Sequence, residues 1–310
     1  MALVGTISPG NITGFKNRII NGDISVAQRG TTFTNVTNQY TIDMWSQSDA
    51  GGFTANISQQ TATTTENAYF SSQNFLRYKK NAAVTSAIVM KVEDLQQFNN
   101  KTFTLSFWAK SSDLTVQPSI TTYTVNDGSN YNNYFTQTYV TRPALSTTWQ
   151  KYEVRYVFPD IYTYGFSGAH HLRLQFFDGA TVGTFDIAEV QLEEGSIATR
   201  FEKRPFATEL GLCQRYYLMI ADGTLIGSGY LTNTLYLDFP IRWPVTMRAT
   251  PNVSKNGTWN VSGNNGQPTI SLAGPSGCSV RITATATGQV YATLSGGSSS
   301  PSLSASAEIS

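Results

Sequence analysis

Charged side chains, cysteine and long apolar runs are all scarce in this sequence. Only 13% of its 310 residues are Asp, Glu, Lys or Arg, against about 25% in an average soluble protein. The 21 basic and 20 acidic residues leave a formal net charge of +1. Because nucleic-acid binding depends on neutralising phosphates with a basic surface, a sequence this evenly balanced predicts no nucleic-acid partner.

The apolar residues give no membrane or export signal. The longest apolar stretch, Ala82–Met90, is interrupted by Thr85 and Ser86, whereas a membrane-spanning helix needs about 20 apolar residues. The first residues, MALVGTISPGN, have neither the basic start nor the apolar core of a signal peptide. We therefore expect no membrane insertion and no signal peptide.

Two cysteines are too few for a disulfide framework or for a four-ligand zinc site. We expect Cys213 and Cys278 to be small buried residues. No glycine loop with the spacing that cradles a phosphate occurs, and we expect no cofactor.

What the sequence does contain is a series of short stretches in which apolar and polar residues alternate. In Thr102–Lys110 the residues Phe103, Leu105, Phe107 and Ala109 share one face. Gln150–Phe158 and His170–Phe177 alternate in the same way, and turn signals such as Asp127-Gly128 and Asp178-Gly179 separate such stretches. Many short strands with regular turns predict an all-β sandwich or jelly roll.

The same patterns divide the chain into four parts. Residues 1–16 are expected to form an extended arm and residues 17–205 a jelly-roll β-sandwich. Residues 206–219 carry apolar residues at roughly helical spacing after Pro205, with Thr208 as a plausible N-cap, and predict a helical connector. Alternation resumes afterwards, so residues 220–310 are expected to form a second, smaller β-sandwich domain.

An ordered series of short motifs runs through the chain. They are Asn17-Arg18-Ile19-Ile20-Asn21-Gly22-Asp23, Gln28-Arg29-Gly30-Thr31, Tyr40-Thr41-Ile42-Asp43-Met44-Trp45, Phe103–Lys110, Gly183–Ile187, Val190–Gly195, Phe201-Glu202-Lys203-Arg204-Pro205 and Glu209–Tyr217. In this order they resemble bacteriophage tail-fibre and related virion appendage proteins whose core is like a carbohydrate-binding-module jelly roll. The resemblance covers nearly the whole chain after residue 16.

The resemblance implies a structural, non-enzymatic protein of the virion, assembled in the host cytoplasm and homotrimeric. A tail fibre or similar appendage would contact host-surface glycans, and the arm (residues 1–16) would dock onto other virion proteins. Two alternatives stay open. One is a head or capsid decoration protein, or a fibre protein, without receptor binding. The other is a glycan depolymerase, although such enzymes usually need a long β-helix and no repeat of that kind is visible.

Jelly-roll carbohydrate modules often carry a structural calcium ion, and the resemblance directs attention to two residues for it. Asp23 and Glu189 would be the candidate ligands. The sequence departs from the family pattern at both places, with Ile24-Ser25-Val26 after the first motif and Ala188 near the expected aspartate. Calcium needs six or more oxygen ligands, so we expect no metal site.

Catalytic residues are hard to assemble from this sequence. The only two histidines, His170 and His171, are adjacent on an expected strand and would face opposite ways, one packed and one solvated. They cannot serve one triad or one metal. We expect no enzymatic activity.

The aromatic residues divide into two groups. Trp45, Trp108 and Trp149 occupy strand or motif positions and are expected to pack in the core. Tyrosines beside Asn, Asp and Gly in two expected loops suit glycan binding, because a ring can stack on a sugar while amides and carboxylates bond its hydroxyls. These candidate glycan-binding residues are Tyr131, Tyr134, Tyr162 and Tyr164. The alternative is that these loops pack at a subunit interface, where Tyr is equally enriched.

Overall fold

The computed structural model shows an all-β protein with one short α-helix, as the sequence predicts. It describes residues 14–49, 51–52, 55–112, 121–126, 130–132, 136–139, 145–164, 170–220, 224–232, 236–261, 267–283, 287–293 and 302–309. The chain divides into an N-terminal unit, residues 1–209 with 309–310, and a C-terminal unit, residues 210–308. The arm predicted for residues 1–16 lies outside the described residues except for its last three.

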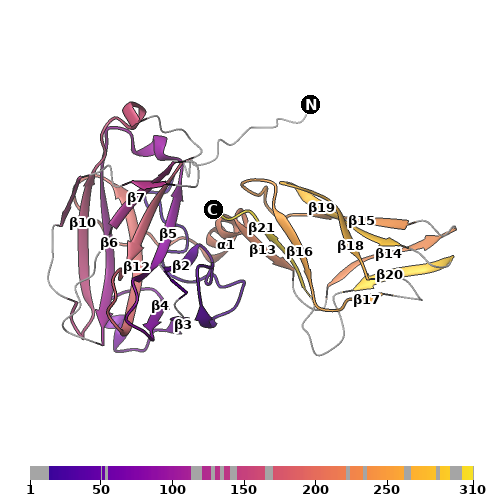
Figure 1. The fold of residues 1–310 in the computed structure, drawn as a ribbon, viewed down its shortest axis with the longest axis horizontal. Coiled ribbons are helices and arrows are strands. Elements are labelled where there is room, and N and C mark those ends of the chain that lie inside the picture. The colour runs from indigo at the N-terminus through magenta and orange to yellow at the C-terminus, as the bar shows by residue number, and fades with distance from the viewer. Residues whose placement is uncertain are drawn as a thin grey trace. The chain divides into compact units, whose positions relative to one another are not determined.

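The N-terminal unit is a sandwich of two antiparallel sheets. The seven-stranded sheet has the order β1 (Thr32–Val36), β3 (Ala55–Thr61), β4 (Asn74–Lys80), β12 (Gly183–Glu194), β6 (Thr102–Ser111), β10 (Gln150–Val157) and β9 (Thr136–Tyr139). The five-stranded sheet has the order β2 (Trp45–Asp49), β5 (Ser86–Glu93), β11 (His171–Phe176), β7 (Thr121–Asn126) and β8 (Asn130–Asn132). Figure 1 shows β6, β10 and β12 as long neighbouring strands.

The described residues of this unit also form three 3₁₀ helices between the strands. They are η1 (Glu66–Ala68), η2 (Leu95–Phe98) and η3 (Ile161–Tyr164).

The alternation of the strands places their apolar residues between the two sheets. Phe103, Leu105 and Phe107 of β6 are fully buried. The Phe107 ring stacks on Tyr152 of β10 at 5.5 Å and meets Phe176 of β11 edge-on at 5.4 Å. Aromatic contacts of this kind add about 0.5–1.5 kcal/mol each beyond the area they bury, and the contact between Phe107 and Phe176 joins the two sheets.

Two asparagines anchor the first sequence motif, and one of them, Asn17, holds it against β12. The Asn17 side chain accepts from the backbone N–H groups of Ile19 and Leu192 and donates to the Val190 carbonyl. Asn21 has a left-handed backbone, with φ of 56°, which asparagine adopts more readily than most residues. Its amide donates to the carbonyls of Val26 and Asp43, so the segment is anchored by buried hydrogen bonds.

Helix α1 (Phe206–Gln214) is shorter than the connector predicted for residues 206–219. It begins directly after Pro205, whose carbonyl accepts from the backbone N–H groups of Thr208 and Glu209. Thr208 therefore lies inside the helix and is not its N-cap. The strand β13 (Tyr217–Ile220) takes up the end of the predicted range and pairs with β21 (Ser302–Ser306).

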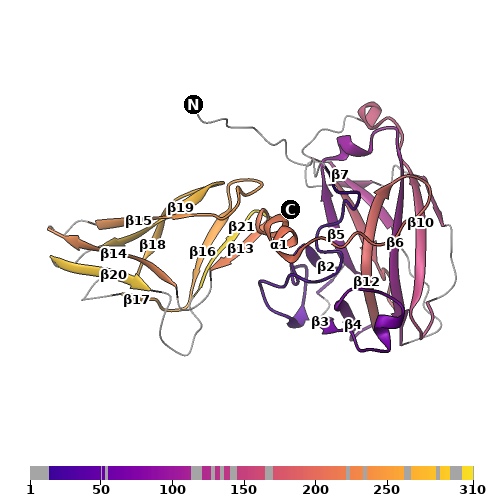
Figure 2. The ribbon, with the colours of Figure 1, turned by 180° about the vertical axis from the view of Figure 1, so that it is seen from behind.

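The C-terminal unit consists of three three-stranded antiparallel sheets, visible from behind in Figure 2. Their strand orders are β13–β21 (Ser302–Ser306)–β16 (Asn252–Asn256), β14 (Leu225–Leu231)–β20 (Gly288–Thr293)–β17 (Asn260–Val261), and β15 (Tyr236–Arg242)–β19 (Gly277–Thr283)–β18 (Thr269–Gly274). Its main core cluster surrounds Trp243, Trp259 and Val280. No helix of the described residues is long and apolar enough to cross a membrane.

Both cysteines are buried, as predicted, and neither is in a disulfide. Burial raises the pKa of the Cys278 thiol to about 11, so at pH 8 only about one molecule in a thousand carries the reactive thiolate. We expect a thiol reagent at pH 8 to label neither Cys213 nor Cys278 in the native protein and to label both in urea. Rapid stoichiometric labelling of the native protein would contradict this.

Candidate functional site

A segment between β3 and β4 crosses the outer face of the seven-stranded sheet. Phe70 of this segment meets Trp149 edge-on at 4.8 Å, and both pack with Phe75 and Ala188 in a buried cluster. The segment contains η1. It therefore covers part of a sheet face that would otherwise meet solvent.

Glu66 ties this segment to the sheet. Its carboxylate accepts from the Lys110 ammonium at 2.9 Å, and from the backbone N–H and hydroxyl of Thr63 at 3.0 Å. Burial opposes ionisation of Glu66, but the bonds from Thr63 and Lys110 outweigh it and lower its pKa to about 2. Since an unfolded glutamate has a pKa near 4.5, this anchor stabilises the fold above that pH and is lost as pH falls toward 2.

Beside the crossing segment lies a pocket of about 300 Å³, here called the Tyr69–Trp108 pocket. Its floor is the outer face of the sheet, where Trp108 and Ser106 of β6 lie beside Lys151 of β10. The register places Lys151 directly opposite Trp108, and Ala188 of β12 opposite Trp108 on the other side. The floor is thus fixed by the backbone ladder of three strands.

Two segments form the walls of this pocket. The crossing segment contributes Asn67, Tyr69, Phe70 and Ser71, and the stretch after β12 contributes Arg200 and Phe201. The Tyr69 ring is 41% exposed and meets the half-buried Trp108 edge-on, with 6.0 Å between ring centroids. A large aromatic surface therefore faces a solvent-accessible hollow together with amide, hydroxyl and charged groups.

Glu189 lines the same pocket from a bulge in β12. The pairing register shifts between Ala188 and Gln191, and Glu189 has a left-handed backbone with φ of 48°. Its Oε1 accepts from the Ser71 N–H, the Ser71 hydroxyl and the Ser72 N–H at 2.6–2.9 Å. Its Oε2 accepts from none of the described residues, and so presents an acceptor for a hydroxyl of a ligand.

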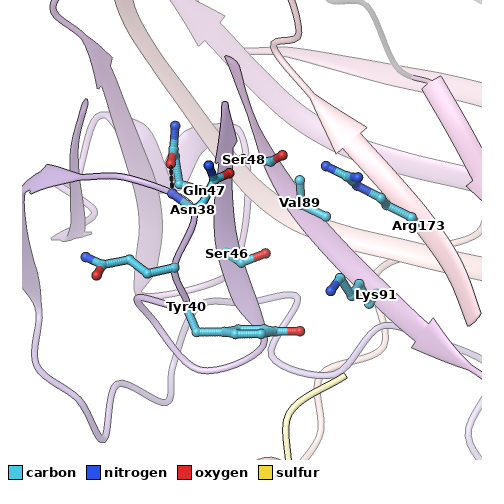
Figure 3. A pocket seen from close by; sticks show the side chains of 9 residues that line it. Asn38, Tyr40, Ser46, Gln47, Ser48, Val89, Lys91 and Arg173 are labelled. Atoms are coloured by element: carbon cyan, nitrogen blue, oxygen red, sulfur yellow. Dashed lines mark hydrogen bonds between the residues drawn. The ribbon is translucent and has the colours of Figure 1, made fainter. Parts of the chain in front are cut away.

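A second, smaller pocket of about 190 Å³ lies on the outer face of the five-stranded sheet. Figure 3 shows Ser46 of β2, Val89 and Lys91 of β5 and Arg173 of β11 around it, with Tyr40 beside them. Lys91 and Arg173 are directly opposite each other in register. The Tyr40 hydroxyl and the Lys91 ammonium both donate to the Ile309 carbonyl, at 2.8 and 2.7 Å.

These contacts give the two pockets different characters. In the smaller pocket the aromatic hydroxyl and one of the two cations already bind the main chain, which points to a structural role. The Tyr69–Trp108 pocket has the larger volume, at the lower end of the range of about 300–1,000 Å³ for ligand sites. It also offers an exposed aromatic ring beside polar groups. We take it as the candidate functional site.

None of the four tyrosines predicted to bind glycan is among the residues that line this pocket in the described part of the chain. Tyr162 lies in η3 and is 56% exposed. Tyr164 ends η3 and Tyr131 lies on β8, but their side chains, like all of Tyr134, fall outside the described residues. A glycan site at these positions stays a prediction.

The two calcium candidates engage different segments. Asp23 Oδ1 accepts from the Ser25 N–H and hydroxyl, at 3.3 and 2.8 Å, while Glu189 binds Ser71 and Ser72. Within the described ranges, no three His, Cys, Asp or Glu side chains are grouped to hold a metal ion.

Two predictions about side-chain burial were wrong. Both His170 and His171 are buried, at 6% and 4% exposure, so neither is the solvated partner expected from strand alternation. Trp45 and Trp149 are buried as predicted, but Trp108 is half-buried and lines the pocket. Its outward direction was readable from alternation, since Trp108 shares a face with Thr104, Ser106 and Lys110.

Comparison with known proteins gives likenesses of fold only. No family model and no curated protein matches the sequence. Among solved structures, the enzymatically active domain of tailspike protein 4 from bacteriophage CBA120 aligns with 58% of this chain and 22% of its own, at 15% identity and a TM-score of 0.39. This chain thus spans about a fifth of that tailspike structure.

Two further structures align over their whole length. One is a putative sugar binding protein from Bacteroides thetaiotaomicron, which covers 58% of this chain and 100% of its own at 12% identity, with a TM-score of 0.36. The other is a CBM4 structure, which covers 57% of this chain and 99% of its own at 19% identity, with a TM-score of 0.37.

Proposed function

We propose that this chain is a glycan-binding component of a bacteriophage virion appendage, a tail fibre or similar structure, and that the Tyr69–Trp108 pocket is its glycan site. The observation that carries the proposal is the exposed Tyr69 ring beside Trp108 above a floor of fixed strands. A sugar ring can stack its C–H face on such an aromatic surface, while Asn67, Ser106 and Glu189 bond its hydroxyls. The ordered motifs of the sequence support the virion role.

Binding without cleavage is part of the proposal. Glycoside hydrolysis uses two carboxyl groups on either side of the scissile bond, and Glu189 is the one carboxylate among the residues that line the pocket in the described part of the chain.

Trimer formation and docking through residues 1–16 complete the proposal. Three weak sites on one appendage would combine into firm attachment by multivalency.

Removing the exposed ring should weaken binding. We expect Tyr69→Ala to reduce the affinity of the purified protein for host cells about ten-fold, because it removes most of the aromatic area that a sugar would bury. The measurement is adsorption of labelled protein to host cells over a range of protein concentrations.

A matched control removes a more exposed tyrosine from the other unit. Tyr230 is 72% exposed, and Tyr230→Ala should leave adsorption unchanged. Wild-type adsorption by folded Tyr69→Ala would reject the pocket as the glycan site. If Tyr162→Ala alone weakened adsorption, the site would belong to the tyrosines predicted from the sequence.

A further inference from the structure

The side chains around the Tyr69–Trp108 pocket offer a ligand more positive charge than negative charge. Arg200 and Lys151 both line the pocket, and Arg200 is exposed. The Arg200 carbonyl accepts from Lys16 and from the Gln191 amide, which holds the backbone in place. Among the described residues, its guanidinium has no carboxylate partner.

Three glutamates near Arg200 are engaged by other donors. Glu193 accepts from the Thr199 N–H and hydroxyl, both at 2.7 Å, and Glu202 accepts from the backbone N–H of Asn17 at 2.9 Å. Glu189 binds the crossing segment through Oε1, as described above. None of these carboxylates neutralises the guanidinium.

Lys151 is only partly neutralised. Its ammonium lies 3.4 Å from Glu153 Oε1, and the two side chains are 35% and 27% exposed. An ion pair this exposed and this long contributes little to stability. Another anion can therefore readily replace Glu153 as the partner of Lys151. Two cationic residues therefore line the pocket, Lys151 on the floor and Arg200 on a wall.

We propose that the Tyr69–Trp108 pocket selects sugars that carry an anionic substituent, which pairs with the Arg200 guanidinium while the ring stacks on Tyr69. This inference rests on the proposed glycan site and names its ligand class. Arg binds carboxylate, sulfate and phosphate through the same fork of N–H donors. The shared chemistry is thus a negative group on a sugar ring.

The test compares acidic and neutral sugars of otherwise equal shape. Galacturonic acid is paired with galactose, glucuronic acid with glucose, and glucose 6-phosphate and galactose 6-sulfate form separate arms. Saturation-transfer NMR with the 310-residue protein gives the affinity for each sugar. We expect an acidic sugar to bind at least ten-fold more tightly than its neutral partner, and the preference to shrink as salt is added.

Variants separate selectivity from binding itself. In the Arg200→Gln variant, the affinities for the acidic and the neutral sugar of a pair should differ by no more than about two-fold. Lys79→Gln makes the same charge change at an exposed residue of β4 and should keep the preference. Equal wild-type affinity for both sugars, or a preference that survives Arg200→Gln, would overturn the inference.

Failure of the underlying site gives a different result. If Tyr69→Ala bound both sugars of a pair as tightly as the wild type, the glycan site itself would be wrong. A second result would be that the wild type binds neutral sugars in a way that depends on Tyr69, but binds no acidic sugar at concentrations on the order of 50 mM. This result would support the glycan site and reject the anionic ligand class.

Discussion

Replacing Arg204 by methionine should lower the free energy of unfolding of the N-terminal unit by about 3–5 kcal/mol, as expected when one member of a buried ion pair is removed. The side chains of Arg204 and Glu209 are 2% and 6% exposed, and Arg204 Nη1 lies 3.0 Å from both carboxylate oxygens. The guanidinium also donates to the carbonyls of Ile19 and Asn17. The variant would leave the Glu209 carboxylate with the Asn21 N–H as its remaining donor, and it would remove a donor from each of the two buried carbonyls.

The pH dependence gives this prediction a second readout. Burial raises the pKa of Glu209, and the Arg204 charge opposes that rise; without Arg204 the pKa rises further. An acid whose folded pKa exceeds its unfolded value loses stability as pH rises through the folded pKa. The deficit of Arg204→Met should therefore be smallest below pH 4.5, the ordinary pKa of Glu209, and grow toward neutral pH.

Hydrogen exchange of β6 and β12 amides in urea reports on the N-terminal unit alone. The matched control is Lys101→Met, which breaks an ion pair with Glu194 whose side chains are 42% and 48% exposed. It should cost less than about 1 kcal/mol. If Arg204→Met and Lys101→Met lowered the free energy of unfolding equally, the buried ion pair would contribute no more to stability than the exposed one.

Gly22→Ala should destabilise the same unit by about 3 kcal/mol, the upper end of what overpacking usually costs. A Cβ atom on Gly22 would lie 2.1 Å from the Val190 carbonyl oxygen and 3.3 Å from Ile19 Cγ2. The Val190 N–H donates to the Gly22 carbonyl at 2.9 Å, so the two backbones are joined where the methyl group would enter. β12 lies between β4 and β6 and cannot shift without disturbing both pairings.

Gly51→Ala is the matched control, since a Cβ atom at Gly51 meets nothing within 4 Å. Its stability should stay within about 1 kcal/mol of the wild type. Hydrogen exchange in urea again gives the free energies of unfolding. A Gly22→Ala protein as stable as Gly51→Ala would mean that the first motif is not held against β12 as described.

The strands were predictable because their signal is local. Phe103, Leu105 and Phe107 alternate with polar residues, and this alone places them in the core. The shorter helix was harder, because Tyr216 and Tyr217 fit helical spacing and only the pairing of Tyr217 with Ser306 decides for a strand. Pairing over such a sequence distance is invisible to a periodicity argument.

The candidate site depends almost wholly on such distant contacts. Trp108 was visible as an outward-facing residue, but nothing near it in sequence says that Tyr69 folds over it. The bulge that turns Glu189 toward Ser71 needs a left-handed backbone at a glutamate, a conformation that a glutamate rarely adopts. The one local signal for the crossing segment is Thr63 with Glu66, three residues apart as in a capping box.

The construction of the pocket also bears on how its specificity can diverge. Ser106, Trp108 and Lys151 are set by the ladder of β6 and β10, so a change of backbone there would misalign the sandwich. Tyr69 and Arg200 stand on connecting segments outside the strands, where substitutions and length changes are better tolerated. Among sequence relatives of this chain, we expect the residues of the floor to be conserved while those of the two walls diversify.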